Sequence, residues 1–174
     1  MSLLPLAEYV AETLDVGPGT RVFEVDCGDG AFLLPLHHNG YIVGGIDGDP
    51  EAIAQASAAM PDGIFQVGVA AALDPGVPWD VVICRSFGAR FDLAAATSAE
   101  ADQMRGLLAR MFAKATHAIA VLDVPDDRRK WMLRALAEIG ANAIQMEQPK
   151  AAAGDELLSE RTELKDVFNV FARV

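Results

Sequence analysis

The chain has 174 residues, of which 52% are hydrophobic, and this length favours one domain with a sizeable buried core. Its formal charge of −11 disfavours binding to nucleic-acid phosphates, and no apolar run is long enough to predict a membrane span. Two cysteines are too few for a disulfide framework or a cysteine-rich zinc site, so we expect a protein of the reducing cytoplasm.

Helices and short strands alternate from the first residues onward. A helical spacing of apolar residues over 4–14 comes first, and it lacks the basic start of a secretory signal. Further on, apolar runs bounded by glycine and proline predict strands, and helically spaced patterns with capping residues predict helices. The expected strands cover 21–25, 41–46, 64–67, 81–84 and 118–122, and the expected helices cover 31–38, 51–60, 100–114 and 126–139, the last of them capped by Asp126-Asp127.

Two late strands are expected at 143–147 and 167–172, with no helix of normal length between them, so they should form an antiparallel pair. The earlier alternation requires helical crossovers and predicts a parallel sheet covered by helices on both faces. We therefore expect one α/β domain over residues 1–174, with an N-terminal helix in residues 1–16 and the core in residues 20–174.

The segment after the first strand has the composition of a ligand-binding loop. Gly28 and Gly30 let the backbone adopt positive φ and approach a ligand closely, and the following helix start offers free N–H groups. In an open parallel sheet, ligands bind at this carboxyl edge of the strands. The dinucleotide fingerprint requires a third glycine where Leu33 stands, which disfavours the alternative of a nicotinamide-dependent oxidoreductase.

Two acids follow the second expected strand. Asp47 stands directly at the strand end before Gly48, where a carboxylate can accept hydrogen bonds from the two hydroxyls of a ribose. Asp49 precedes Pro50 at a helix start, and we interpret it as an N-terminal cap. The pattern indicates a nucleotide-containing cofactor without identifying it.

Several segments, in this order, resemble the motifs of class I S-adenosylmethionine-dependent methyltransferases. Residues 22–30, Val-Phe-Glu-Val-Asp-Cys-Gly-Asp-Gly, resemble the first motif, Glu/Asp-x-Gly-x-Gly-x-Gly. Residues 45–53 resemble the second, in which an acid binds the ribose, and residues 79–84 resemble the fourth strand with its aromatic-Asp start. Residues 133–174 resemble the closing helix and reversed strand hairpin. The resemblance implies a Rossmann-like three-layer sandwich with a mostly parallel seven-stranded sheet and a C-terminal antiparallel strand.

The resemblance implies S-adenosylmethionine as the cofactor and methyl transfer to an unidentified acceptor as the activity, and the acidic charge favours a small-molecule acceptor. The acceptor site is expected to be open, or completed by a second copy of the chain in a homodimer, because no lid insertion is apparent. An alternative is a catalytically degenerate member that binds the cofactor or a partner subunit without turnover. The implied cofactor-binding residues are Glu24, Asp26, Cys27, Gly28, Asp29, Gly30, Asp47, Gly48, Val69, Ala70, Cys84 and Arg85.

Two of these residues depart from the family pattern. Asp26 replaces the first glycine, close to the methionine part of the cofactor, where its carboxylate either repels the cofactor's carboxylate or faces its ammonium or sulfonium group. Val69 replaces the acid that accepts from the adenine amino group, which leaves adenine recognition to backbone groups and apolar contact. The chain after the fourth strand also lacks the Asn/Asp-Pro-Pro-Tyr/Phe signature of amino-methylating nucleic-acid enzymes.

The acceptor side carries no fixed catalytic motif, because methyl transfer depends mainly on holding donor and acceptor in line. No catalytic residue and no metal site are predicted. Among the candidates near the acceptor, Cys84 is interpreted as a buried small hydrophobe, Arg85 and Arg90 as solvated cations, and Asp123 as structural. Asp92 is the remaining candidate.

Overall fold

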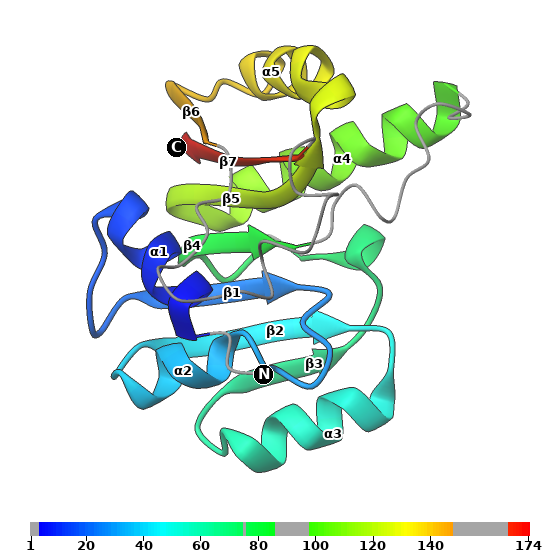
Figure 1. The fold of residues 1–174 in the computed structure, drawn as a ribbon. Helices are drawn as coiled ribbons and strands as arrows, with labels where there is room; N and C mark the ends of the chain where they lie inside the picture. The colour runs from blue at the N-terminus through cyan, green and yellow to red at the C-terminus, as the bar shows by residue number, and fades with distance from the viewer. Residues whose placement is uncertain (1–3, 75, 86–97, 148–166) are drawn as a thin grey trace.

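One seven-stranded sheet with helices on both faces organises the chain, as Figure 1 shows. The computed structural model describes residues 4–74, 76–85, 98–147 and 167–174. The strands are β1 (Arg21–Val25), β2 (Ile42–Asp47), β3 (Ile64–Val67), β4 (Trp79–Cys84), β5 (Ala115–Pro125), β6 (Ala143–Glu147) and β7 (Val167–Arg173).

The order of the strands in the sheet is β3-β2-β1-β4-β5-β7-β6. The first five strands in this order pair in parallel, while β7 lies between β5 and β6 and runs antiparallel to both. This arrangement confirms the predicted mostly parallel sheet with one antiparallel strand near the C-terminus. The order reverses at β1 and β4, so the carboxyl ends of these two neighbours form the switch point where ligands bind in open α/β sheets.

Five α-helices cover the two faces of the sheet in the described residues. They are α1 (Leu4–Leu14), α2 (Leu33–His38), α3 (Pro50–Ala59), α4 (Ser98–Lys114) and α5 (Arg129–Glu138). The apolar residues of α1, α2 and α3 pack on one face, and those of α4 and α5 pack on the other. Short 3-10 turns, η1 (Ala70–Ala72) and η2 (Asp126–Arg128), follow β3 and β5. None of the helices in these ranges has the length and apolar character needed to cross a membrane.

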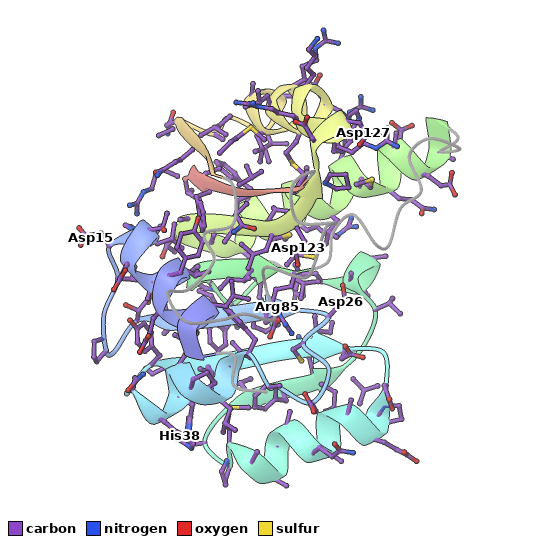
Figure 2. All side chains as sticks on the ribbon, in the orientation of Figure 1. Asp15, Asp26, His38, Arg85, Asp123 and Asp127 are labelled. Atoms are coloured by element: carbon purple, nitrogen blue, oxygen red, sulfur yellow. The ribbon has the colours of Figure 1, made fainter. Side chains whose placement is uncertain are left out.

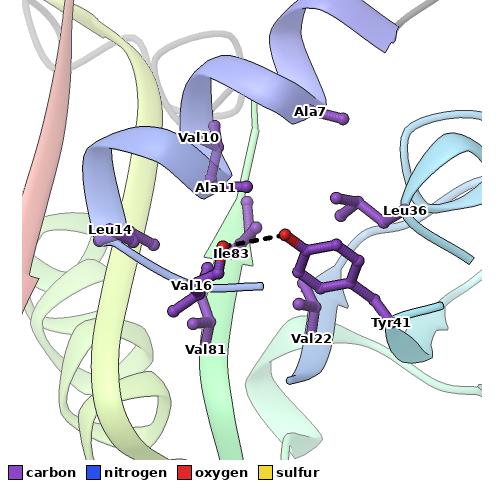
Figure 3. A pocket seen from close by; sticks show the side chains of 10 residues that line it. All are labelled: Ala7, Val10, Ala11, Leu14, Val16, Val22, Leu36, Tyr41, Val81 and Ile83. Atoms are coloured by element: carbon purple, nitrogen blue, oxygen red, sulfur yellow. Dashed lines mark hydrogen bonds between the residues drawn. The ribbon is translucent and has the colours of Figure 1, made fainter. Parts of the chain in front are cut away.

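Helix α1 lies over β1 and β4, where its apolar side chains face Val22, Val81 and Ile83 across a small cavity (Figure 3). The Tyr41 hydroxyl donates a hydrogen bond of 3.0 Å to the Val16 carbonyl and so fixes the chain that leaves this helix. The cavity under α1 measures about 10 Å³, which is room for no more than a single water molecule. At this size the cavity is a packing defect and not a ligand site.

The bounds of several predicted elements differ from those in the structure, and three differences have a clear physical cause. Helix α2 begins at Leu33 and not at residue 31, because the glycine loop continues into its first expected turn. Strand β5 extends from Ala115 to Pro125, well beyond the predicted 118–122, because pairing with β7 continues past a bulge between Val121 and Val124. No side chain caps η2 or α5, so the predicted cap at 126–127 is wrong.

Candidate functional site

The loop between β1 and α2 has three residues in the left-handed backbone region. Asp26, Gly28 and Gly30 have φ values of 59°, 55° and 77°. Glycine adopts this region without strain, and aspartate tolerates it better than most other residues. The loop is tied to the neighbouring strand because the Cys27 amide donates to the Ile46 carbonyl at 3.1 Å. The loop therefore has the turn that Gly28 and Gly30 predict, and Asp26 occupies a position that suits glycine better.

Asp47 joins the end of β2 to the glycine loop. Its Oδ2 accepts a hydrogen bond of 2.8 Å from the Gly28 amide, and its Oδ1 accepts one of 2.9 Å from the Asp49 amide. A carboxylate offers about four acceptor positions, so two of them stay available for other donors. Asp47 therefore shapes the loop and can still receive hydroxyl groups of a ligand. The predicted cap is confirmed as well, because Asp49 accepts from the Glu51 amide at 2.9 Å.

The two glycines of the loop serve different purposes. A Cβ atom added to Gly30 would lie 2.5 Å from Cε of Met60 and 3.2 Å from Cβ of Ala56, so Gly30 permits close packing of the loop on α3. A Cβ atom added to Gly28 would meet nothing within 4 Å. The space at Gly28 is open, which is what a ligand approaching the backbone requires. Asp29 is exposed beside it, and its carboxylate accepts from the Ala31 amide at 3.1 Å.

Glu24 and Arg85 form an ion pair at the carboxyl ends of β1 and β4. Glu24 is 0% exposed, and its Oε1 accepts from Nε of Arg85, which follows the register pair Val25–Cys84. Burial raises the pKa of Glu24 to about 7, although the Arg85 guanidinium opposes the shift. Within the described ranges, Oε2 of Glu24 has no hydrogen-bond partner. A buried carboxylate oxygen of this kind marks a place where a ligand or solvent donor belongs.

Arg85 is held from two sides. Its guanidinium carbon also lies 5.1 Å from the centre of the Phe32 ring, a cation–π distance. The side chain is only 25% exposed, so the expectation of a solvated Arg85 is wrong. Phe32, which the sequence analysis did not single out, is fully buried under the loop and supports this arginine.

The two cysteines are buried, and neither forms a disulfide. Burial, with help from neighbouring Glu24 and Asp47, raises the pKa of the Cys27 thiol to about 12, so the thiol stays protonated at neutral pH. A Cβ atom on Gly45 would lie 2.6 Å from Sγ of Cys27, which shows how closely this side chain packs on β2. Cys84 is likewise 0% exposed, in agreement with its interpretation as a small hydrophobe. Because its side chain is buried, Cys27 can contact a ligand only through its backbone.

The end of β3 lies beside the acid of β2. A Cβ atom on Gly48 would lie 3.9 Å from Cγ1 of Val69, and the Val69 side chain is 59% exposed. Ala70 follows as the first residue of η1. The structure therefore brings Gly48, Val69 and Ala70 to the same edge as the glycine loop, with an apolar and accessible side chain at Val69.

The acceptor-side candidates are only partly described. Figure 2 shows Asp26, Arg85 and Asp123 at the carboxyl edge of the central strands. Asp123 sits at the β5 bulge with a φ of 56°, and its amide donates to Oδ1 of the buried Asn169 at 3.2 Å. It is therefore part of the strand and not of a loop. Arg90 and Asp92 lie outside the described residues. Among the residues in view, no group of three or more metal-ligating side chains could hold an ion.

Asn169 and Phe32 are the residues of this edge that sequence reasoning missed. Asn169 is a polar residue within the apolar run of β7, a pattern that signals a buried hydrogen bond. Glu24, within the apolar run of β1, gave the same signal. No comparable signal identified Phe32, because a buried phenylalanine needs no polar partner.

No model of a protein family matches the chain. Two curated proteins share short segments with it, and each is a 23S rRNA (uracil(1939)-C(5))-methyltransferase. The protein from Thiobacillus denitrificans is 41% identical over 67 residues, which are 36% of this chain and 16% of that protein. The protein from Shewanella amazonensis is 51% identical over 43 residues, 25% of this chain and 10% of that protein. The chain therefore matches only a small part of these relatives.

Solved structures match over most of the chain. The magnesium protoporphyrin IX methyltransferase of Synechocystis PCC 6803, crystallised with S-adenosylmethionine, has a TM-score of 0.69 and 16% identity over 98% of this chain and 78% of that one. A TehB-like methyltransferase of Corynebacterium glutamicum has a TM-score of 0.67 and 15% identity over 97% of this chain and 86% of that one. An amino pentose methyltransferase of Micromonospora echinaspora, solved with bound S-adenosylmethionine, has a TM-score of 0.57 and 25% identity over 70% and 50% of the two chains.

Proposed function

Because this chain has the fold of class I S-adenosylmethionine-dependent methyltransferases, we propose that it binds S-adenosylmethionine at the β1–α2 loop and transfers the methyl group to a small-molecule acceptor. The observation that carries the proposal is the bridge from Asp47 to the Gly28 amide. This hydrogen bond holds an acid that has acceptor positions left for a ribose beside an open glycine, near the switch point of β1 and β4, and so supports the proposal.

The residues at this edge fit the parts of such a cofactor. Asp47 has acceptor positions left for two ribose hydroxyls, and the open space at Gly28 admits a ligand to the backbone. The exposed Val69 offers an apolar surface for an adenine ring. The unpartnered buried oxygen of Glu24 accepts a donor from the amino-acid part, directly or through water. Helix α2 has only six residues, so the predicted contribution of its N-terminus is not part of this proposal.

When bound, S-adenosylmethionine supplies a methyl group that passes to an acceptor lone pair while the electrons of the broken carbon–sulfur bond return to sulfur. The protein's part is to hold the donor and acceptor in line, which accounts for about 7–11 kcal/mol of barrier reduction at best. The Glu24–Arg85 ion pair holds the ends of β1 and β4 together. It thereby fixes the surface at these strand ends where the methyl donor and the acceptor would meet.

A small-molecule acceptor agrees with the charge of the chain. The curated relatives with matching segments are named as rRNA methyltransferases, which would favour an RNA acceptor. However, a formal charge of −11 repels a polyphosphate backbone, and the matched segment is only a small share of those enzymes. Small molecules carry no such penalty, so we favour them.

Calorimetry with S-adenosylmethionine tests the cofactor part of the proposal. We expect saturable binding that Asp47→Ala weakens at least tenfold, because the substitution removes the ribose acceptor and frees the Gly28 amide. Asp49→Asn is the matched control, since asparagine also caps helices and the residue stands beside Asp47. Thermal unfolding must show that both variants fold. Absence of binding by the folded native chain would reject the proposal.

A transfer assay tests the acceptor. The native chain is incubated with methyl-labelled S-adenosylmethionine and either a small-molecule extract or total RNA. We expect label in the small-molecule fraction, and no label with Asp47→Ala. Label found only in RNA would reject the small-molecule acceptor. Cofactor binding without transfer to either fraction would favour the catalytically degenerate alternative.

A further inference from the structure

We propose that Asp26 makes the site select the cationic methyl donor over its neutral product, S-adenosylhomocysteine. The inference rests on the proposed function and adds to it a specificity-determining residue. It depends on the charges that surround the glycine loop and on the position that the left-handed turn gives to Asp26.

The described part of the loop holds more negative than positive charge. Glu24, Asp26 and Asp47 lie at the ends of β1 and β2, and Arg85 directly follows the end of β4. Arg85 is paired with Glu24, and Glu24 keeps a buried oxygen without a hydrogen-bond partner in the described ranges. Burial is the largest cause of the raised pKa of Glu24, and the nearby negative charges of Asp26 and Asp47 add to it, so the three carboxyl groups share one small volume.

Asp26 is fixed in this volume by its backbone. Its φ of 59° turns the chain directly after β1, and the next two amides are held by Ile46 and by Asp47. Its side chain is half-buried, so its charge is less screened by solvent than that of the exposed Asp29. A left-handed aspartate where glycine would be unstrained has a cost, and residues kept in such conformations cluster at functional sites.

The two ligands differ in one charge. The donor carries a sulfonium, an ammonium and a carboxylate and has a net charge of about +1, whereas the product has lost the sulfonium charge. Repulsion between Asp26 and the carboxylate acts on both ligands alike, so it cancels when their affinities are compared. The remaining difference is the attraction of a negative site for the sulfonium. An opposite charge close by shifts a pKa by about 1–3 units, and the lower end of this range corresponds to about tenfold in affinity.

Calorimetry with three ligands tests the inference. They are S-adenosylmethionine, S-adenosylhomocysteine and sinefungin, which carries an ammonium group at the place of the sulfonium. The native chain is expected to bind the two cationic ligands about tenfold more tightly than the neutral product. Asp26→Asn keeps the size of the side chain and tolerates positive φ, and it is expected to reduce the preference to about twofold or less. Asp49→Asn removes one charge from the same edge and is expected to retain the preference.

The outcomes separate this inference from the proposed function. Equal affinities of the native chain for the three ligands would reject the inference and leave the proposed function in place. An undiminished preference in Asp26→Asn would also reject the role of Asp26. If the folded native chain bound none of the three ligands, both the proposed function and the inference would be rejected.

Discussion

At the scale of single residues, the ionisation of Glu24 is the most informative property of the site. Burial raises its pKa from 4.5 to about 7 despite the Arg85 guanidinium. Removing a carboxylate from water is costly, and a single partner that is itself partly exposed offsets only part of that cost. The folded protein therefore binds a proton at Glu24 in mildly acidic solution that the unfolded chain does not bind.

This proton gives a testable dependence of stability on pH. Between the unfolded pKa of 4.5 and the folded pKa of about 7, the native state holds more protons at Glu24, so its contribution to stability falls as the pH rises. From pH 5.5 to pH 8 the loss is on the order of 2 kcal/mol. Urea unfolding of the native chain and of Glu24→Gln at both pH values measures it. The variant should lack this loss, and identical pH dependences in the two proteins would contradict the assignment.

The pairing of Glu24 with Arg85 could not be predicted from the sequence. The two residues are 61 positions apart, and only the parallel register of β1 and β4 brings them together. The position of Glu24 inside an apolar strand is a signal in the sequence that this side chain needs a partner, although not which one. The carboxyl-edge positions of Asp47 and the glycines were predictable, since Asp47 stands at the end of one strand, the glycine loop follows another, and parallel strands end at one edge. Their roles in cofactor binding stay predictions.

At the scale of elements, local signals decided which boundaries could be predicted. Helix α3 and strand β3 match the expectation within a residue, because Asp49-Pro50 marks the start of the helix and Pro61-Asp62-Gly63 marks its end. The length of β5 could not be predicted, because its last residues are strand only through pairing with β7, far along the chain. The missing cap of α5 could not be predicted either, because Asp126 and Asp127, the acids expected to cap this helix, form the 3-10 turn η2 before it.

The contact between the glycine loop and α3 gives a prediction for the stability of these elements. Gly30→Ala places a Cβ atom at a φ of 77° and against Met60 and Ala56, so we expect a loss of about 2–3 kcal/mol in unfolding free energy. Gly28→Ala also places a Cβ atom on a residue with positive φ, but without a clash, so it should lower the unfolding free energy by only about 1 kcal/mol. Chemical denaturation of the two variants measures the difference. A larger loss for Gly28→Ala would contradict the packing described for Gly30.

At the scale of the whole molecule, charge is the dominant property. The chain carries 25 acidic and 14 basic side chains, and its isoelectric point is about 4.6. Few of the ion pairs in the described residues are shielded from solvent, so most of this excess charge faces water and repels itself. At an ionic strength of 0.01 M the Debye length is about 30 Å, and the repulsion then acts across the molecule.

Salt should therefore stabilise the protein at neutral pH. We expect the melting temperature at pH 7.5 to rise by a few degrees between 0.01 M and 0.3 M NaCl, because screening weakens the self-repulsion. A titration near pH 4.6, where the net charge approaches zero, is the control and should show little change. Differential scanning calorimetry measures both. An equal rise at the two pH values would attribute the effect to the ions themselves and not to screening.

The place of β7 in the sheet has a consequence for how the chain is made. β7 follows β6 in sequence but lies between β5 and β6, and in the described part of the chain β6 pairs with no other strand. While the ribosome is still synthesising the chain, β5 has an open edge and β6 has no partner. The five parallel strands, β1 to β5, can pair with one another before β7 emerges, and the candidate site can form with them. Vectorial synthesis thus separates an early half that forms the site from a late half that closes the sheet and covers an aggregation-prone edge.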